Sequence, residues 1–100
     1  MDEFDWDDGN APKIEQRYSI EEVEFALIFE NPVLVRTDEV DGEVRRRVAS
    51  LTQDGERITI VYTLRKVRGG IKIRPLSAFP TTSAWEVRAF EKGHPRAPLP

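Results

Sequence analysis

Basic side chains alternate with apolar ones in the last third of the chain, and this pattern predicts phosphate binding. Residues 71–78 read IKIRPLSA, with Lys72 and Arg74 in step, and Arg65 stands in the preceding apolar segment 57–66. If both segments are strands of one hairpin, these three side chains share a face, whether Lys72 or Arg74 lies opposite Arg65. A guanidinium group directs two N–H groups at two oxygens and stays charged at any working pH, which suits phosphate.

Arg46 is expected on the same face. The pair Asp54-Gly55 is a strong signal for a two-residue hairpin turn, and such a turn sets Arg46 opposite Thr63. A basic sheet surface suits single-stranded RNA, because unpaired nucleotides offer both phosphates and flat bases. The alternative interpretation is a solvated sheet face whose lysines and arginines prevent aggregation through the sheet edges.

Composition excludes several kinds of catalytic site. The chain of 100 residues has no cysteine and one histidine, His94, which precedes a proline. A catalytic triad, a thiolate nucleophile and a zinc site cannot be assembled from such a set, so we expect no metal and no small-molecule cofactor. Any cleavage would depend on arginine, lysine and glutamate, which position groups and stabilise charge. RNA permits such chemistry because its own 2′-hydroxyl can serve as the nucleophile.

Charge is distributed unevenly along the chain. Residues 1–30 carry ten acidic and two basic side chains, whereas residues 31–100 carry eight acidic and thirteen basic ones. An acidic segment attached to a basic body predicts an anionic partner for the body, while the acidic segment is solvated or folds back. No apolar run is long enough to cross a membrane, and residues 1–10 lack the basic start of a signal peptide. We therefore expect a cytoplasmic protein without membrane contact.

Two helices are predicted before the strands. The first covers residues 11–17. The second begins with a capping box, in which Ser19 and Glu22 exchange hydrogen bonds between side chain and backbone, and it ends before Asn31-Pro32. Apolar residues form two stripes on this second helix, so its C-terminal half is expected to be buried nearly all round. The stripes are Val23, Ala26 and Leu27, and Phe25, Ile28 and Phe29.

An antiparallel sheet follows, with strand 57–66 in its interior. The four strands are predicted at residues 33–40, 44–53, 57–66 and 71–78. Pro75 cannot donate to a β-ladder, so the last strand must have a free side or a bulge there. The residues expected to form the core side of the sheet are Ile58, Ile60, Leu64, Ile71 and Ile73.

A final helix begins after Pro80, where Ser83 and Glu86 offer a second capping-box match. Residues 93–100 form a proline-rich, extended tail, which leaves residues 1–92 as one domain. The sequence therefore predicts an α+β fold with two N-terminal helices, a four-stranded antiparallel sheet and a C-terminal helix.

The order of these pieces resembles the BrnT toxins of bacterial toxin–antitoxin pairs. The matching pieces are Phe4-Asp5-Trp6-Asp7, SIEEVEFALIFENPVLV, Thr63-Leu64-Arg65 and IKIRPLSA, followed by a capped helix, and together they cover residues 4–90. BrnT proteins have a RelE-like fold, act as ribonucleases that arrest translation, and are held inactive by a ribbon-helix-helix antitoxin. The resemblance therefore implies a RelE-like fold, mRNA as the substrate and a BrnA-like antitoxin as the partner.

Carried onto this sequence, the resemblance assigns roles to single residues. It implies Arg65 and Arg74 as catalytic phosphate clamps and Glu86 as an acid–base partner. The residues expected to contact RNA are Trp6, Arg46, Lys72 and Ser77.

Two positions depart from the family pattern. The family has a lysine-histidine pair before the second helix where this chain has Glu15-Gln16, and an arginine after Ser-Ala where it has Phe79. A hydrophobic ring cannot stabilise developing negative charge, so we expect at most weak ribonuclease activity. Phe79 could instead stack on a base, or pack under the last helix beside Trp85 and Phe90. The alternative functions are a non-catalytic BrnT-fold module that binds a protein and an unrelated small binding protein.

Overall fold

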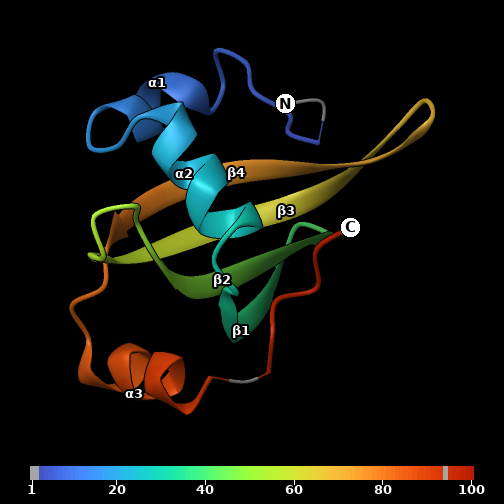
Figure 1. The fold of residues 1–100 in the computed structure, drawn as a ribbon. Coiled ribbons are helices and arrows are strands. Elements are labelled where there is room, and N and C mark those ends of the chain that lie inside the picture. The colour runs from blue at the N-terminus through green and yellow to red at the C-terminus, as the bar shows by residue number, and fades with distance from the viewer. Residues whose placement is uncertain (1–2, 94) are drawn as a thin grey trace.

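Two helices, four strands and a third helix follow one another along the chain (Figure 1), which confirms the predicted α+β order. The structure is a computed structural model that describes residues 3–93 and 95–100, so His94 lies outside the described residues. The helices are α1 (Ala11–Glu15), α2 (Ile20–Ile28) and α3 (Ala84–Lys92). The strands are β1 (Val33–Val40), β2 (Glu43–Leu51), β3 (Arg57–Val67) and β4 (Gly70–Pro80).

The sheet is an antiparallel meander in the order β1-β2-β3-β4, so β3 is an interior strand as predicted. Asp41 and Gly42 make the first turn with positive φ angles of 51° and 81°, and Val40 pairs directly with Glu43. The second turn differs from the prediction. Pairing of β2 with β3 begins only at Leu51 and Arg57, so residues 52–56 form a longer loop.

A hydrogen-bonded ring explains the longer loop. The Thr52 amide donates to the Glu56 carbonyl at 2.9 Å, and the Glu56 amide donates to the Thr52 hydroxyl at 3.1 Å. These bonds close the loop outside the Asp54-Gly55 pair, and they set the register between β2 and β3. Arg46 consequently pairs with Tyr62 and not with Thr63.

A bulge interrupts β4 at the position where Pro75 removes a donor. Val61 pairs with Ser77 whereas Tyr62 pairs with Pro75, which leaves Leu76 as the extra residue. The prediction was a free side or a bulge at this proline, and the structure has the bulge.

Both edges of the sheet are covered by terminal segments. Along β4, the Asp5 amide donates to the Ile73 carbonyl at 2.9 Å and the Ile73 amide donates to the Glu3 carbonyl at 2.7 Å. Along β1, the Leu34 amide donates to the Pro95 carbonyl at 2.8 Å. The Ala97 amide in turn donates to the Pro32 carbonyl at 3.0 Å. The edges are therefore not open to pairing with another chain at these positions.

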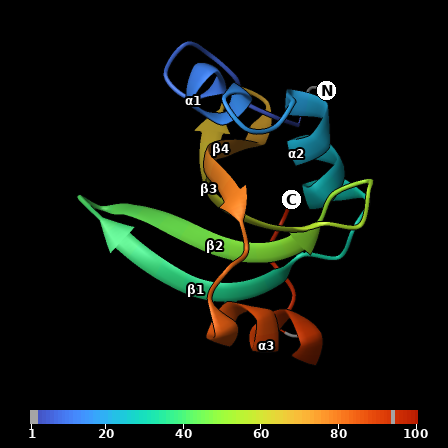
Figure 2. The same cartoon turned by 90° about the vertical axis from the view of Figure 1, so that its left-hand side faces the viewer.

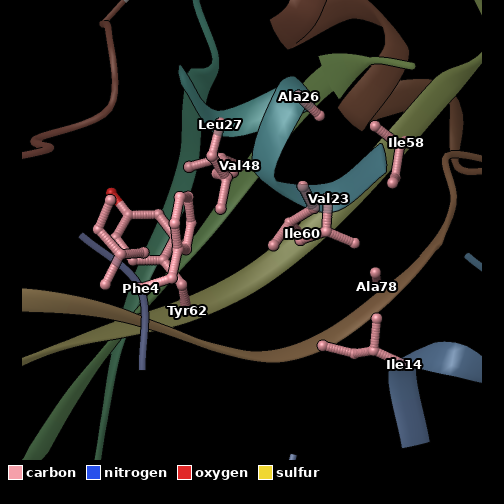
Figure 3. Close-up of a cluster of buried hydrophobic side chains, with 11 residues drawn as sticks. Phe4, Ile14, Val23, Ala26, Leu27, Val48, Ile58, Ile60, Tyr62 and Ala78 are labelled. Atoms are coloured by element: carbon pink, nitrogen blue, oxygen red, sulfur yellow. The ribbon is translucent and has the colours of Figure 1, made fainter. Parts of the chain in front are cut away.

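Helix α2 covers one face of the sheet and encloses the core (Figure 3). The core stripe of α2 packs over the buried side chains of Val48, Ile60 and Tyr62, and Phe4 lies beside Tyr62. The Ser50 hydroxyl donates to the Ala26 carbonyl at 2.7 Å, which ties α2 to β2. The α2 residues in the core are Val23, Ala26 and Leu27. The capping box at the start of α2 is present as predicted.

The second apolar stripe of α2 is not buried, contrary to the prediction. Phe29 is 70% exposed and Ile28 is 37% exposed. The sheet covers only one side of this nine-residue helix, and the stripe lies on the other side. Ile71 was also assigned wrongly to the core, because it lies at the tip of the β3–β4 hairpin, beyond the reach of α2, and is 46% exposed.

Helix α3 packs against β1 and β2, away from α1 and α2 (Figures 1 and 2). The predicted second capping box is wrong, because the Ser83 hydroxyl donates to the Glu86 carboxylate and makes no cap bond. Within residues 3–93 and 95–100, no helix has the length and apolar character needed to cross a membrane.

Candidate nucleic-acid interface

The two predicted phosphate clamps lie together, but carboxylates of the N-terminal segment occupy them. The guanidinium of Arg74 forms a forked contact with Asp7, at 3.0 Å from Nη1 to Oδ2 and 2.9 Å from Nη2 to Oδ1. Its Nη1 also donates to Oδ2 of Asp5 at 3.2 Å. Arg65 reaches the same Asp5 oxygen at 3.0 Å. The predicted clamps are thus partners of two acidic side chains within the chain itself.

A buried asparagine fixes the segment that carries these carboxylates. Asn10 is 1% exposed, and its side-chain amide donates to the Pro75 carbonyl at 2.8 Å and to the Asp5 carbonyl at 3.0 Å. Its side-chain oxygen accepts from the Asp7 amide at 2.9 Å. Gly9 allows the close approach, since a Cβ there would stand 3.0 Å from Arg74 Nη2. The acidic segment therefore folds back onto β4 in a defined geometry.

The contacts between Arg74 and Asp7 shift the pKa values of both side chains. The hydrogen bonds from Arg74, followed by one from the Gly9 amide, lower the pKa of Asp7 below its ordinary value. The same pairing raises the pKa of Arg74, whose side chain is only 10% exposed. The forked pair is therefore charged on both sides at neutral pH, and Arg74 has little surface left to offer a ligand.

Strand pairing separates Arg46 from the other predicted cations. Arg65 pairs with Lys72, and Arg74 pairs with Thr63, so these three basic residues share the sheet face opposite α2, as predicted. Arg46 pairs with Tyr62, whose side chain lies in the core under α2, so the prediction for Arg46 is wrong. The register change caused by the longer β2–β3 loop is the reason.

Glu86, on α3, lies in a polar cluster between this helix and the sheet. Its carboxylate is 4% exposed overall and accepts from the Thr59 hydroxyl at 3.4 Å as well as from Ser83. Arg47 Nη1 approaches Glu86 Oε1 at 3.7 Å. Arg74 pairs with Thr63 on β3, whereas Glu86 accepts from the side chain of Thr59, four residues away, which corresponds to about 13 Å along the strand. Glu86 therefore does not join Arg65 and Arg74 in one site.

Phe79 has a cation as its neighbour. The guanidinium carbon of Arg47 lies 5.3 Å from the centre of the Phe79 ring, within cation–π range. Arg47 pairs with Val61 and Phe79 pairs with Thr59, which puts both side chains on the face opposite α2. A positive charge thus stands beside the position where the resemblance implies an arginine, although β2 supplies it and not β4.

A pocket of about 320 Å³ lies between α1 and the end of β4. Lys13 and Arg17 are exposed on its helix side, and Ser77 and Phe79 line its strand side. In the described part of the chain, neither Lys13 nor Arg17 takes part in an ion pair. The full lining is Lys13, Gln16, Arg17, Ser77, Ala78 and Phe79.

Trp6 is held away from this pocket. Its indole Nε1 donates to Glu24 Oε2 at 2.9 Å, and its ring stacks with Phe4 at 6.4 Å between centres. Trp6 therefore links the N-terminal segment to α2.

Sequence reasoning placed Ser77 in the candidate interface but missed Lys13, Arg17 and Arg47. The signal was the spacing of Lys13, Gln16 and Arg17 in the predicted helix 11–17, since residues three and four apart share one face of a helix. In the structure α1 ends at Glu15, and Gln16 and Arg17 lie in the turn that follows it. Arg47 could not be found without the register, because one residue decides which face of β2 a side chain occupies.

Comparison of the chain with protein-family models, curated proteins and solved structures finds no match.

Proposed function

We propose that this protein binds single-stranded RNA in the pocket between α1 and β4, as a BrnT-like toxin component. The observation that carries this proposal is that Lys13 and Arg17, which form no ion pair within the described residues, line one concave surface together with Phe79. Nonspecific single-strand binding needs cations along the phosphates and an aromatic surface for a base. The pocket offers both within the size range of small-ligand sites.

Each part of a nucleotide finds a matching group in this pocket. Lys13 on α1 and Arg17 in the turn that follows it line the same side of the pocket and suit a phosphate that passes along the rim. Phe79 offers a surface on which a base can stack, and Arg47 adds positive charge beside it. The Ser77 hydroxyl is a donor and acceptor for a ribose 2′-hydroxyl.

A second candidate function is a catalytically inactive BrnT-fold module that binds a partner protein. The observation in its favour is the engagement of all three side chains implied as catalytic. Arg65 and Arg74 contact carboxylates of the N-terminal segment, and Glu86 is buried against Thr59. On the RNA-binding proposal, cleavage is therefore slow at most, because no free cation of this set faces a scissile phosphate.

The proposal extends to partner and compartment. A BrnT-like protein would act on mRNA in the cytoplasm, without a metal or cofactor, and would be neutralised by a ribbon-helix-helix antitoxin.

Fluorescence anisotropy with a labelled oligouridylate of about eight nucleotides tests the binding proposal, since a single domain contacts a few nucleotides at a time. Lys13→Ala combined with Arg17→Ala should weaken binding and reduce the magnitude of the salt slope by about 1.4, for two lost phosphate contacts. Lys66→Ala combined with Arg68→Ala removes the same net charge from the β3–β4 hairpin and is the matched control.

The control pair should leave the salt slope close to the wild-type value. Equal losses in both double variants would show that only net charge matters, which contradicts a site at the pocket. Affinity and slope that are unchanged in the Lys13 and Arg17 variant would also exclude this site.

Growth on expression without an antitoxin separates the two candidate functions. Wild-type protein that binds RNA but cleaves it slowly should inhibit growth weakly, and Phe79→Arg, which removes the stacking surface, should inhibit growth no more than wild type. Strong growth arrest by the wild-type protein would contradict the expectation of weak activity. RNA binding with no arrest by either protein would favour the inactive module.

A further inference from the structure

The C-terminal half of α2 carries an exposed apolar patch formed by Phe25, Ile28 and Phe29. Phe29 is 70% exposed and Ile28 is 37% exposed. The rings of Phe25 and Phe29 lie 5.5 Å apart, so they form a continuous aromatic surface. The other exposed large apolar residues in the described chain stand on hairpin tips or on α3, and they are Val40, Val44, Ile71 and Trp85. The α2 patch is the one in which two such residues, Ile28 and Phe29, are adjacent and supported by a third apolar side chain, Phe25.

The spacing of the patch matches the surface of a packed helix. Phe25, Ile28 and Phe29 occupy positions i, i+3 and i+4, which form one stripe along α2. The core stripe of the same helix faces the sheet, and in the described chain the second stripe has no covering element. A helix that lays apolar side chains along such a stripe is a common mode of protein recognition.

Charge around the patch selects the kind of helix. Residues 18–35 contain four glutamates and no lysine or arginine. The carboxyl end of α2 adds partial negative charge from its unpaired carbonyl groups. Just beyond this end, the Arg96 guanidinium donates to the Asn31 carbonyl at 2.6 Å. The surroundings of the patch therefore favour a positively charged partner.

We propose that this patch is a docking surface for a basic amphipathic helix of a partner protein. Leucine-like side chains of that helix would cover Phe25, Ile28 and Phe29, while its lysines or arginines would face Glu21 and Glu30. A second copy of this chain is a poorer occupant, because two-fold pairing of the patch would bring like-charged glutamates together. The patch shares no residue with the pocket between α1 and β4, so the docking proposal does not depend on RNA binding.

A designed peptide tests the chemistry of this surface. The probe is a labelled peptide of about 18 leucines and lysines at helical spacing, long enough to form a helix on binding. A matched peptide has glutamate in place of every lysine. The wild-type protein should bind the lysine peptide and not the glutamate peptide, as measured by fluorescence anisotropy.

Protein variants locate the binding surface. Phe29→Ser should raise the Kd for the lysine peptide about tenfold or more, as expected for an aromatic anchor. Ile71→Ser removes a similarly exposed apolar side chain from the far hairpin and should leave the Kd unchanged. Glu30→Lys should raise the Kd roughly threefold through charge alone. Because Phe29 is largely exposed, Phe29→Ser should melt at the wild-type temperature, and Glu30→Lys provides a second test.

Three results would overturn the proposal. The first is that the wild-type protein does not bind the lysine peptide, or that wild type, Phe29→Ser and Glu30→Lys bind it with the same Kd. The second is equal binding of the lysine and glutamate peptides. The third is a wild-type dimer in sedimentation that Phe29→Ser converts to a monomer, which would make the patch a self-interface.

Discussion

Arg74 and Lys13 carry the same charge but differ in what surrounds them. The guanidinium of Arg74 is shared between Asp5 and Asp7 and is almost enclosed, whereas Lys13 is exposed at the rim of a pocket. A ligand phosphate would have to displace two carboxylates to reach Arg74, and it would displace only water at Lys13. Accessibility to a ligand phosphate thus distinguishes Arg74, a cation that stabilises the fold, from Lys13, a cation that can bind RNA.

The pairing of Asp7 with Arg74 predicts a pH-dependent contribution to stability. Arg74 holds the pKa of Asp7 below the ordinary value of 3.8. The contribution is therefore present above pH 3.8 and lost as the pH falls below it through the lowered pKa. Asp7→Asn should be less stable than wild type at neutral pH, and the difference should shrink as the pH falls below 3.8, as measured by urea unfolding.

Asp8→Asn is the control for this experiment, because Asp8 is exposed and has no contact with Arg74 in the described chain. It should unfold at nearly the wild-type urea concentration at neutral pH. A stability difference between wild type and Asp7→Asn that is the same at neutral and acidic pH would show that the ion pair does not stabilise the fold.

Phe79 should contribute to RNA affinity through its ring. Phe79→Ala should weaken binding of a single-stranded RNA by about 1–3 kcal/mol, the usual contribution of one stacked base, and Phe79→Tyr should retain it. Anisotropy measures the affinity, and thermal melting checks that both variants are folded. Wild-type affinity in Phe79→Ala would mean that the ring serves only to pack against Arg47.

At the scale of elements, local signals predicted the helices and strands well, and the register between strands less well. The Ser19 capping box, the Asp41-Gly42 turn and the Pro75 bulge are all determined by neighbouring residues, and all three are present. The β2–β3 register depends on Thr52 closing a wider loop, which the Asp-Gly pair does not reveal. That one difference moved Arg46 off the predicted face and brought Arg47 onto it.

The same distinction explains the candidate site. Alternation alone correctly placed Arg65 and Arg74 on one face, because β3 and β4 pair through a short turn. Their pairing with Asp5 and Asp7 is a contact between segments far apart in the sequence, and the uneven charge indicated only that the acidic segment is solvated or folds back. The prediction that the second α2 stripe is buried was wrong, because periodicity shows that a stripe is apolar and does not show that another element covers it.

The capping box should make a measurable contribution to the stability of α2. Ser19→Ala removes the hydroxyl that accepts from the Glu22 amide at 3.1 Å, and it should lower the free energy of unfolding by about 1 kcal/mol. The melting temperature should fall by about 4–8 °C for a domain of this size. Thr82→Ala, at an exposed position before α3, is the control and should melt close to wild type. Equal melting of the Ser19 variant and wild type would mean that packing alone holds the start of α2.

At the scale of the whole molecule, the two ends of the chain complete the sheet. The N-terminal segment lies along β4 and the C-terminal segment lies along β1, so both edge strands of the sheet are covered (Figure 1). The C-terminal segment also reaches the core, where Ala97 and Leu99 pack and the Tyr62 hydroxyl donates to the Pro98 carbonyl at 3.3 Å. Burial raises the pKa of Tyr62 to about 12, so this hydroxyl keeps its proton at physiological pH.

Removal of residues 95–100 should therefore destabilise the whole domain. The lost hydrogen bonds and the apolar contact of Leu99 together predict a decrease of about 2–4 kcal/mol in the free energy of unfolding. Leu99→Ala alone should give a smaller decrease in the same direction, and chemical denaturation measures both. A truncated chain that unfolds at the wild-type denaturant concentration would show that the tail contacts contribute no stability.

The central claim is that RNA binds in the pocket between α1 and β4, and an NMR titration tests it most directly. Backbone amide signals of the ¹⁵N-labelled protein would be followed during addition of a short oligouridylate. The claim predicts that the largest shifts fall on residues 13, 16, 17 and 77–79, which line the pocket, and that residues 63–72 of the β3–β4 hairpin change little. Shifts centred on Arg65 and Lys72, or no shifts at saturating RNA, would contradict it.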